Sequence, residues 1–165
     1  MDFILRDANT SDFEAIAKIS IDSYQEFSTH LSFDNWQKMK NTLANVNITA
    51  NIANFMVAEA DTEIVGAIAY YSCGVSNPKF FNSQWASLRL LAVPFNHRGK
   101  GIGKKLTQEG ILRAKKDCAK GVGLYTSEIM TTAQKMYSNL GFKRSQELPS
   151  MLGLRYWLYL LPLEN

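Results

Sequence analysis

A short segment that follows an apolar run combines three glycines with four basic side chains. Residues 98–105 read RGKGIGKK, and the run LRLLAV ends directly before Pro94. Glycines let a backbone approach an anion closely, and a helix that begins in such a turn presents unpaired N–H groups and the positive end of its dipole. Arg98, Lys100 and Lys104 add full charges, and an arginine can hold phosphate oxygens in a bidentate fork. The segment therefore predicts a phosphate-binding turn, and a tight turn with a purely structural role is the less favoured interpretation.

The spacing of the glycines argues against two common nucleotide-binding motifs. A P-loop needs Gly, four residues and then Gly-Lys-Ser/Thr, but Lys104 stands five positions after Gly99 and no such hydroxyl follows it. The dinucleotide fingerprint Gly-x-Gly-x-x-Gly would need a glycine at Lys104 or at Leu106. Nucleoside triphosphate hydrolysis and a Rossmann-type oxidoreductase are therefore disfavoured.

Two motifs, in order along the chain, resemble those of the GCN5-related N-acetyltransferase (GNAT) superfamily. Arg98, Gly101 and Gly103 match the family's Gln/Arg-x-x-Gly-x-Gly/Ala motif, after a strand that ends in LAV. Residues 133–142, AQKMYSNLGF, are similar to the second signature, Ala-x-x-x-Tyr-x-x-Leu-Gly-Phe. The resemblance covers about residues 54–142 and implies acetyl-CoA as the cosubstrate.

The resemblance also implies a fold and a cofactor site. The expected fold is one α/β (α+β) domain over residues 1–165, with a mixed, mostly antiparallel sheet of about six to seven strands and about four flanking helices. Strands 88–93 and 121–127 should splay apart, with the pantetheine arm of the cofactor between them. The implied cofactor-binding residues lie at the end of the first of these strands and in the glycine-rich turn: Leu91, Ala92, Val93, Arg98, Gly99, Lys100, Gly101, Ile102, Gly103 and Lys104.

The implied reaction is the direct attack of a neutral primary amine on the thioester, through a tetrahedral intermediate. A backbone N–H near Leu91 could stabilise the oxyanion. Tyr137 occupies the family's general-acid position, and a phenol of reference pKa about 10 needs help from the site to protonate a thiolate of reference pKa about 8.5. A module that binds acyl-CoA without transfer is the alternative, because Tyr125 stands where many relatives carry a glutamate as base.

The general base and the acceptor are less well defined. Glu128 and Glu26 are candidate bases, with Asp22 nearby, and a solvated surface carboxylate is the competing interpretation for each. These acidic residues suit a cationic amine, and the acceptor is expected to be a small molecule or a peptide. Several aromatic and histidine side chains could line an acceptor pocket or belong to the core: Tyr24, Phe27, His30, Phe33, Trp36, Tyr71 and Trp85. Nothing places His30 and His97 together as ligands, so we expect no metal.

Apolar periodicity predicts the elements that position these residues. A short strand at 3–6 precedes a helix for which Ser11 and Glu14 are spaced as a capping box. A second helix is expected within 33–47, and a hairpin within 54–73 turns near Asp61 and Thr62. Then follow a strand at 84–93, a helix from 101, a strand at 121–127, a helix at 131–140 closed by Gly141, and a last strand at 155–161 that is interior more often than it is a dimer edge.

The positive charge is concentrated in one part of the chain. Residues 97–120 carry eight basic and two acidic side chains, a net +6 against +3 for the whole chain. This asymmetry marks an anion-facing surface. Nucleic-acid binding through this basic helix is a third hypothesis, disfavoured because the aromatic residues do not interleave with the lysines.

Length and composition indicate one globular domain. A chain of 165 residues with 46% hydrophobic and 20% charged residues can fold without a disulfide or a metal. Cys73 and Cys118 match no metal spacing and fit a reducing compartment. We expect a cytoplasmic protein with no signal peptide, no membrane span and no nucleic-acid partner, and the sequence leaves open whether it forms a homodimer.

Overall fold

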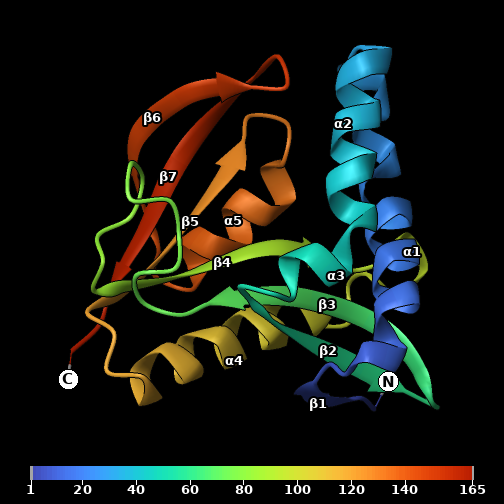
Figure 1. Cartoon of the computed structure of the whole chain (residues 1–165), viewed down its shortest axis with the longest axis horizontal. Helices are drawn as coiled ribbons and strands as arrows, with labels where there is room; N and C mark the ends of the chain where they lie inside the picture. The colour runs from blue at the N-terminus through green and yellow to red at the C-terminus, as the bar shows by residue number, and fades with distance from the viewer. Residues whose placement is uncertain (1, 165) are drawn as a thin grey trace.

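One seven-stranded sheet runs through the computed structural model, which describes residues 2–164 (Figure 1). The strand order is β1-β2-β3-β4-β5-β7-β6. Within the described chain, β4 and β5 form the only parallel pair, and every other neighbouring pair is antiparallel. The strands are β1 (Ile4–Asp7), β2 (Asn54–Ala60), β3 (Glu63–Tyr71), β4 (Trp85–Ala92), β5 (Gly121–Ser127), β6 (Lys143–Met151) and β7 (Leu154–Pro162). The predicted mixed, mostly antiparallel sheet is confirmed.

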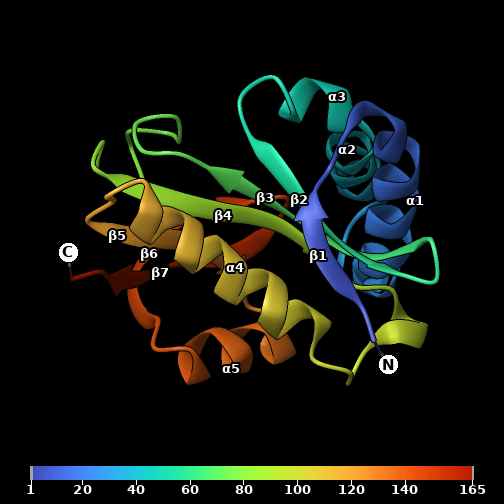
Figure 2. The ribbon, with the colours of Figure 1, turned by 90° about the horizontal axis from the view of Figure 1, so that it is seen from below.

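Helices cover both faces of this sheet (Figure 2). One face carries α1 (Phe13–Tyr24), α2 (Phe33–Ala44) and the short α3 (Val46–Thr49), and the other carries α4 (Ile102–Lys116) and α5 (Thr131–Asn139). α1 packs on β3 and β4, and α4 packs across β2, β3 and β4 from the opposite side. Within residues 2–164, no helix combines the length and apolarity needed to cross a membrane.

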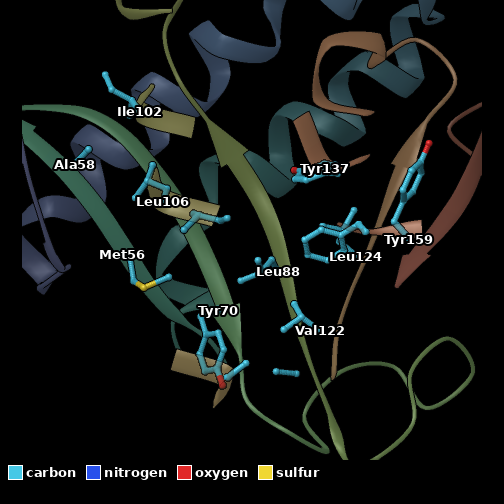
Figure 3. Close-up of a cluster of buried hydrophobic side chains, with 14 of the residues drawn as sticks. Met56, Ala58, Tyr70, Leu88, Ile102, Leu106, Val122, Leu124, Tyr137 and Tyr159 are labelled. Carbon is cyan, nitrogen blue, oxygen red and sulfur yellow. The ribbon is translucent and has the colours of Figure 1, made fainter. Parts of the chain in front are cut away.

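The core under α4 shows how the apolar face of this helix is used. Ile102 and Leu106 of α4 are 1% and 0% exposed, and they pack with side chains of β2, β3 and β4 such as Met56 and Leu88 (Figure 3). The backbone of β3 comes close to α4 at Gly66, where a Cβ would lie 2.6 Å from Cγ2 of Ile102. The start of α4 is thus fixed against the sheet by tight packing.

β4 and β5 separate part-way along their length. They pair at Trp85 with Gly121, Ala86 with Val122 and Ser87 with Gly123, and no further pair follows in this part of the structure. On the other side of β4, the register with β3 shifts between Ala67 and Ala69. Leu90 lies at this irregularity with a φ of 60°, a conformation that costs a non-glycine residue about 1 kcal/mol or more. The predicted splay of the two strands is confirmed.

The structure corrects the start of the first helical segment. The predicted capping box of Ser11 and Glu14 is wrong, because a 3₁₀ turn over Thr10–Asp12 precedes α1. The Asn9 side chain accepts from the N–H of Ser11, and the carboxylate of Asp12 accepts from the N–H of Asn9 at 2.8 Å. Arg6 of β1 donates to both oxygens of that carboxylate, which fixes Asp12 as the second partner of the box.

The end of the sheet differs from the sequence expectation by one strand. β6 is not predicted, because its sequence KRSQELPSM contains a proline and few apolar residues. It lies at the sheet edge, where such a composition is tolerated, and β7 lies between β5 and β6. The interior position favoured for the last predicted strand is confirmed.

Candidate active site

A cavity of about 480 Å³ opens where β4 and β5 separate. Its walls come from the end of α1, the second halves of β4 and β5, the turn before α4, and the start of α5. Tyr24 and Phe27 of the aromatic residues named from the sequence line it, whereas Trp36 is buried elsewhere and Phe33 is 76% exposed. Because the turn before α4 and the helix α5 carry the two predicted motifs, both motifs contribute to this one cavity.

The glycine-rich turn at the start of α4 is open toward this cavity. Gly99 and Gly101 have φ values of 75° and 82°, which a side chain would strain, and a Cβ at either position would meet no atom within 4 Å. Gly101 is the N-cap and offers no side-chain cap. The N–H of Lys105 donates to the Gly101 carbonyl at 3.0 Å. The N–H groups of residues 102–104 come before this bond and have no acceptor within the helix. Such a turn fits a phosphate group.

Most of the predicted cofactor-binding residues meet at the cavity. Eight of them line it: Leu91, Val93, Arg98, Gly99, Gly101, Ile102, Gly103 and Lys104. Ala92 is fully buried and pairs with Ala67 of β3, and neither it nor the exposed Lys100 lines the cavity. The contacts of these ten residues with a cofactor remain predictions.

Arg98 is engaged with α1 instead of reaching freely into the turn. Its Nε donates to the carbonyl of Val93 at 3.0 Å, and one terminal nitrogen donates to the carbonyl of Ser23 at 2.9 Å. The other terminal nitrogen pairs with Glu26 at 2.6 Å. The guanidinium thus joins the end of α1 to the segment that follows β4, which was not foreseen from the motif.

Two side chains at the end of α1 hold the backbone at the end of β4 and directly after it. The Tyr24 hydroxyl donates to the carbonyl of Leu91 at 3.0 Å, and the Ser23 hydroxyl accepts from the N–H of Val93 at 3.3 Å. Neither Leu90 nor Leu91 has a register partner on β3 or β5. Burial raises the pKa of Tyr24 to about 12, so its hydroxyl keeps its proton at neutral pH and remains a donor.

Tyr137 of α5 lies in the wall of the cavity. It is 8% exposed, and its ring stands edge-on to Phe142 with the centroids 5.8 Å apart. Figure 3 shows Tyr137 near Leu124 with its hydroxyl turned toward β4. Burial raises the pKa of Tyr137 far above its usual value, and nearby Tyr24 adds to the effect. The phenol therefore stays protonated at neutral pH and can donate a hydrogen bond to an anion in the cavity.

The candidate bases are not free carboxylates at the cavity. Glu26 is the only carboxylate among its described lining residues, and it is paired with Arg98. Glu128 is exposed, and its Oε1 accepts from the N–H of Arg155 at 3.5 Å. Neither Glu128 nor the exposed Asp22 lines the cavity. The acidic residues that suggested a cationic amine are thus neutralised or lie outside.

One charged residue of the cavity was not singled out from the sequence. Arg89 of β4 lies over the ring of Tyr125 at 5.1 Å and near that of Tyr71 at 5.8 Å. Phe80 and Tyr156 stand edge-on to Tyr125, with centroids 5.9 Å and 6.0 Å away. The signal was an arginine inside the otherwise apolar run LRLLAV. Charged side chains are rare at interior strand positions, so Arg89 is a candidate for a functional role in the cavity.

Comparison with protein families decides how this geometry is classified. The family model of the acetyltransferase (GNAT) domain matches residues 51–144, more than half of the chain. The chain belongs to the GNAT acetyltransferase family. The curated N-acetyltransferase 8B of Mus musculus is 33% identical over 105 residues, which cover 61% of this GNAT chain and 44% of that relative. The chain thus spans less than half the length of this relative.

Solved structures share the whole fold of this GNAT protein at low sequence identity. The PaiA N-acetyltransferase of Thermoplasma acidophilum, in complex with coenzyme A, has a TM-score of 0.77 at 19% identity and covers 99% of this chain and 100% of its own. The putative acetyltransferase yncA of Salmonella typhimurium, with acetyl-CoA, has a TM-score of 0.73 at 18% identity and covers 100% of this chain and 96% of its own. The seven-stranded sheet with splayed β4 and β5 is therefore a GNAT fold.

Proposed function

We propose that this GNAT protein is an N-acetyltransferase that transfers the acetyl group of acetyl-CoA to a primary amine. The observation that carries the proposal is one cavity that joins three features: the glycine-rich turn of α4, the gap between β4 and β5, and the buried Tyr137. The similar folds solved with coenzyme A or acetyl-CoA support it. When bound, acetyl-CoA supplies an acetyl group activated as a thioester.

The residues of the cavity divide the work of binding. The N–H groups at the start of α4 and the ammonium of Lys104 would hold the phosphates, since both attract anions. The exposed backbone of β4 at Leu91, fixed by Tyr24, would orient the acyl arm. A backbone N–H near Leu91 that is held in place before the reaction would stabilise the developing oxyanion without reorganising.

Tyr137 would act on the leaving sulfur. The phenol is protonated at neutral pH, and because its raised pKa makes it a weaker acid than a free tyrosine, its expected contribution is a hydrogen bond to the thiolate instead of full proton transfer. The acceptor amine must lose its proton before attack, and no carboxylate of the described cavity lining is free to take it. The acceptor amine would therefore lose its proton to water, and not to a carboxylate of the protein.

The alternative is a GNAT-fold module that binds acyl-CoA without transfer. The pairing of Glu26 with Arg98 favours it, because a transferase with a dedicated base would keep a carboxylate free. The two functions share the cofactor site and differ only at the acceptor. A measurement of acetyl transfer distinguishes the transferase from the binding module.

The test is acetylation of a panel of primary amines, followed by mass spectrometry and by release of the CoA thiol. Tyr137→Phe should lower kcat by about tenfold to a hundredfold and leave the affinity for acetyl-CoA within about twofold. The matched control is Tyr159→Phe, since Tyr159 is a buried tyrosine of β7 that does not line the cavity. Tight acetyl-CoA binding with no acetylation of any amine would support the binding module instead.

A further inference from the structure

The part of the cavity lined by Arg89 and Tyr125 has its own chemistry. Arg89 lies there, half-buried, with its guanidinium over Tyr125 and near Tyr71. Phe80, Phe81 and Tyr156 pack around the other sides of Tyr125. Tyr125 lines the cavity beside Arg89, and the other rings back Tyr125 from outside the described lining, so this part of the cavity presents one cation next to an aromatic ring.

Arg89 has no counter-charge within the protein. No carboxylate of residues 2–164 lies within ion-pairing distance of it, while Arg6, Arg98, Arg113 and Arg155 each have such a partner. Among the described residues, Glu26 carries the only carboxylate that lines the cavity, and Arg98 holds it at 2.6 Å. The aromatic rings stabilise the guanidinium through cation–π contacts but leave its N–H donors available.

We propose that Arg89 binds a carboxylate of the acceptor, so that the acceptor is a primary amine of the amino-acid class. The planar fork of an arginine matches a carboxylate with two parallel hydrogen bonds. One guanidinium balances one carboxylate, whereas a phosphate dianion would need a second cation. Lys104, which also lines the cavity and has no carboxylate partner among residues 2–164, lies in the first turn of α4.

The same cation excludes the acceptor class suggested by the acidic residues in the sequence. A diamine or polyamine would bring a second positive charge next to Arg89, and like charges within a half-buried cavity repel. An amino acid instead fixes its carboxylate on Arg89, with its side chain against the ring of Tyr125. This proposal deepens the proposed function and rests on it.

The experiment compares acceptors that differ only in the carboxylate. The full chain is assayed with L-phenylalanine against phenethylamine, and with L-lysine against cadaverine, by acetyl-CoA-dependent release of CoA. In the wild type, kcat/KM should be at least about tenfold higher for each amino acid than for its decarboxylated partner. Arg89→Gln should remove this preference, mainly by raising KM of the amino acid, and Arg89→Lys should retain part of it.

A second measurement does not depend on turnover. Calorimetric titration of the CoA-loaded protein should give tighter binding of N-acetyl-L-phenylalanine than of N-acetylphenethylamine in the wild type, and equal binding in Arg89→Gln. Equal binding of the two probes by the wild type, or a preference that survives in Arg89→Gln, would overturn the proposal. Rapid acetylation of cadaverine or phenethylamine in preference to the amino acids would also overturn it while leaving the proposed acetyltransferase intact. Failure to bind acetyl-CoA at all would instead refute the proposed function itself.

Discussion

The close approach of α4 to the sheet at Gly66 makes a quantitative prediction. In Gly66→Ala, the new Cβ would lie 2.6 Å from Cγ2 of Ile102 and 3.0 Å from Cδ1 of Leu106. Both neighbours are almost fully buried, so neither can turn toward solvent. Overpacking of this kind costs about 1–3 kcal/mol, and the loss of glycine flexibility in the unfolded chain returns about 0.4–1 kcal/mol. The middle of these ranges gives a fall in the free energy of unfolding of about 1–2 kcal/mol.

The assay is thermal unfolding of Gly66→Ala beside the wild type. For a chain of this length, the expected loss corresponds to a decrease in Tm of about 2–8 °C. Because Ile102 opens α4, its displacement should also weaken acetyl-CoA binding. An unchanged or higher Tm would refute the close packing of α4 on β3.

Gly103→Ala is the matched control, because it also adds one methyl group near the start of α4, next to Ile102, but at a position with more room. Its Cβ would lie 3.6 Å from Sδ of Met136 and 3.7 Å from Cγ2 of Val93, which are ordinary contacts. Tm should therefore stay equal or rise. Gly103 lines the cavity, so acetyl-CoA affinity should fall without a loss of stability, and a fall of Tm as large as in Gly66→Ala would contradict this assignment.

Three further predictions concern charge and protonation. Arg98→Met removes the bonds to Ser23 and Val93 and the pair with Glu26, and since that side chain is 35% exposed, urea unfolding should show a loss of about 1–2 kcal/mol; an unchanged urea midpoint would contradict the clamp. Burial raises the pKa of Tyr24, Tyr125, Tyr137 and Tyr156, so the folded state binds their protons more tightly than the unfolded state does. Their contribution is therefore complete below about pH 10 and is lost as pH rises through the folded pKa values, by at most about 1.4 kcal/mol per pH unit for each tyrosine; equal stability at pH 9 and pH 11 would refute it. Without a free carboxylate base, kcat/KM should rise about tenfold per pH unit below the pKa of the acceptor amine, and a plateau that begins near pH 6 would indicate a base that we have not identified.

The elements that position the cofactor site are predictable because local signals agree with the tertiary structure. The hairpin turn at Asp61 and Thr62, the glycine N-cap of α4 and the glycine after α5 each mark a boundary that the structure keeps. The predicted strand 121–127 coincides with β5, whose composition is typical of a buried strand. Such segments are predictable from the sequence because the apolar pattern, the turn residues and the packing agree.

The parts that sequence reasoning missed depend on contacts between distant residues. β6 forms because β7 offers an edge to pair with, and not because its own residues favour a strand. Asp12 becomes part of a capping box because Arg6 of β1 holds its carboxylate. The partner of Arg98 could not be predicted from its motif, since Glu26 is 72 residues away in the sequence. Arg89 could have been questioned from the sequence, but its aromatic surroundings come from three separate strands.

The most direct test of the account is a calorimetric comparison of acetyl-CoA with S-acetylpantetheine, which lacks the nucleotide and its phosphates. If the turn at the start of α4 holds the pyrophosphate, the wild type should bind acetyl-CoA at least about tenfold more tightly. In a variant with both Gly101 and Gly103 changed to Val, which must still unfold cooperatively, that difference should disappear. Equal affinity of the wild type for the two compounds would contradict the phosphate-binding role of the glycine-rich turn, and with it the proposed cofactor site.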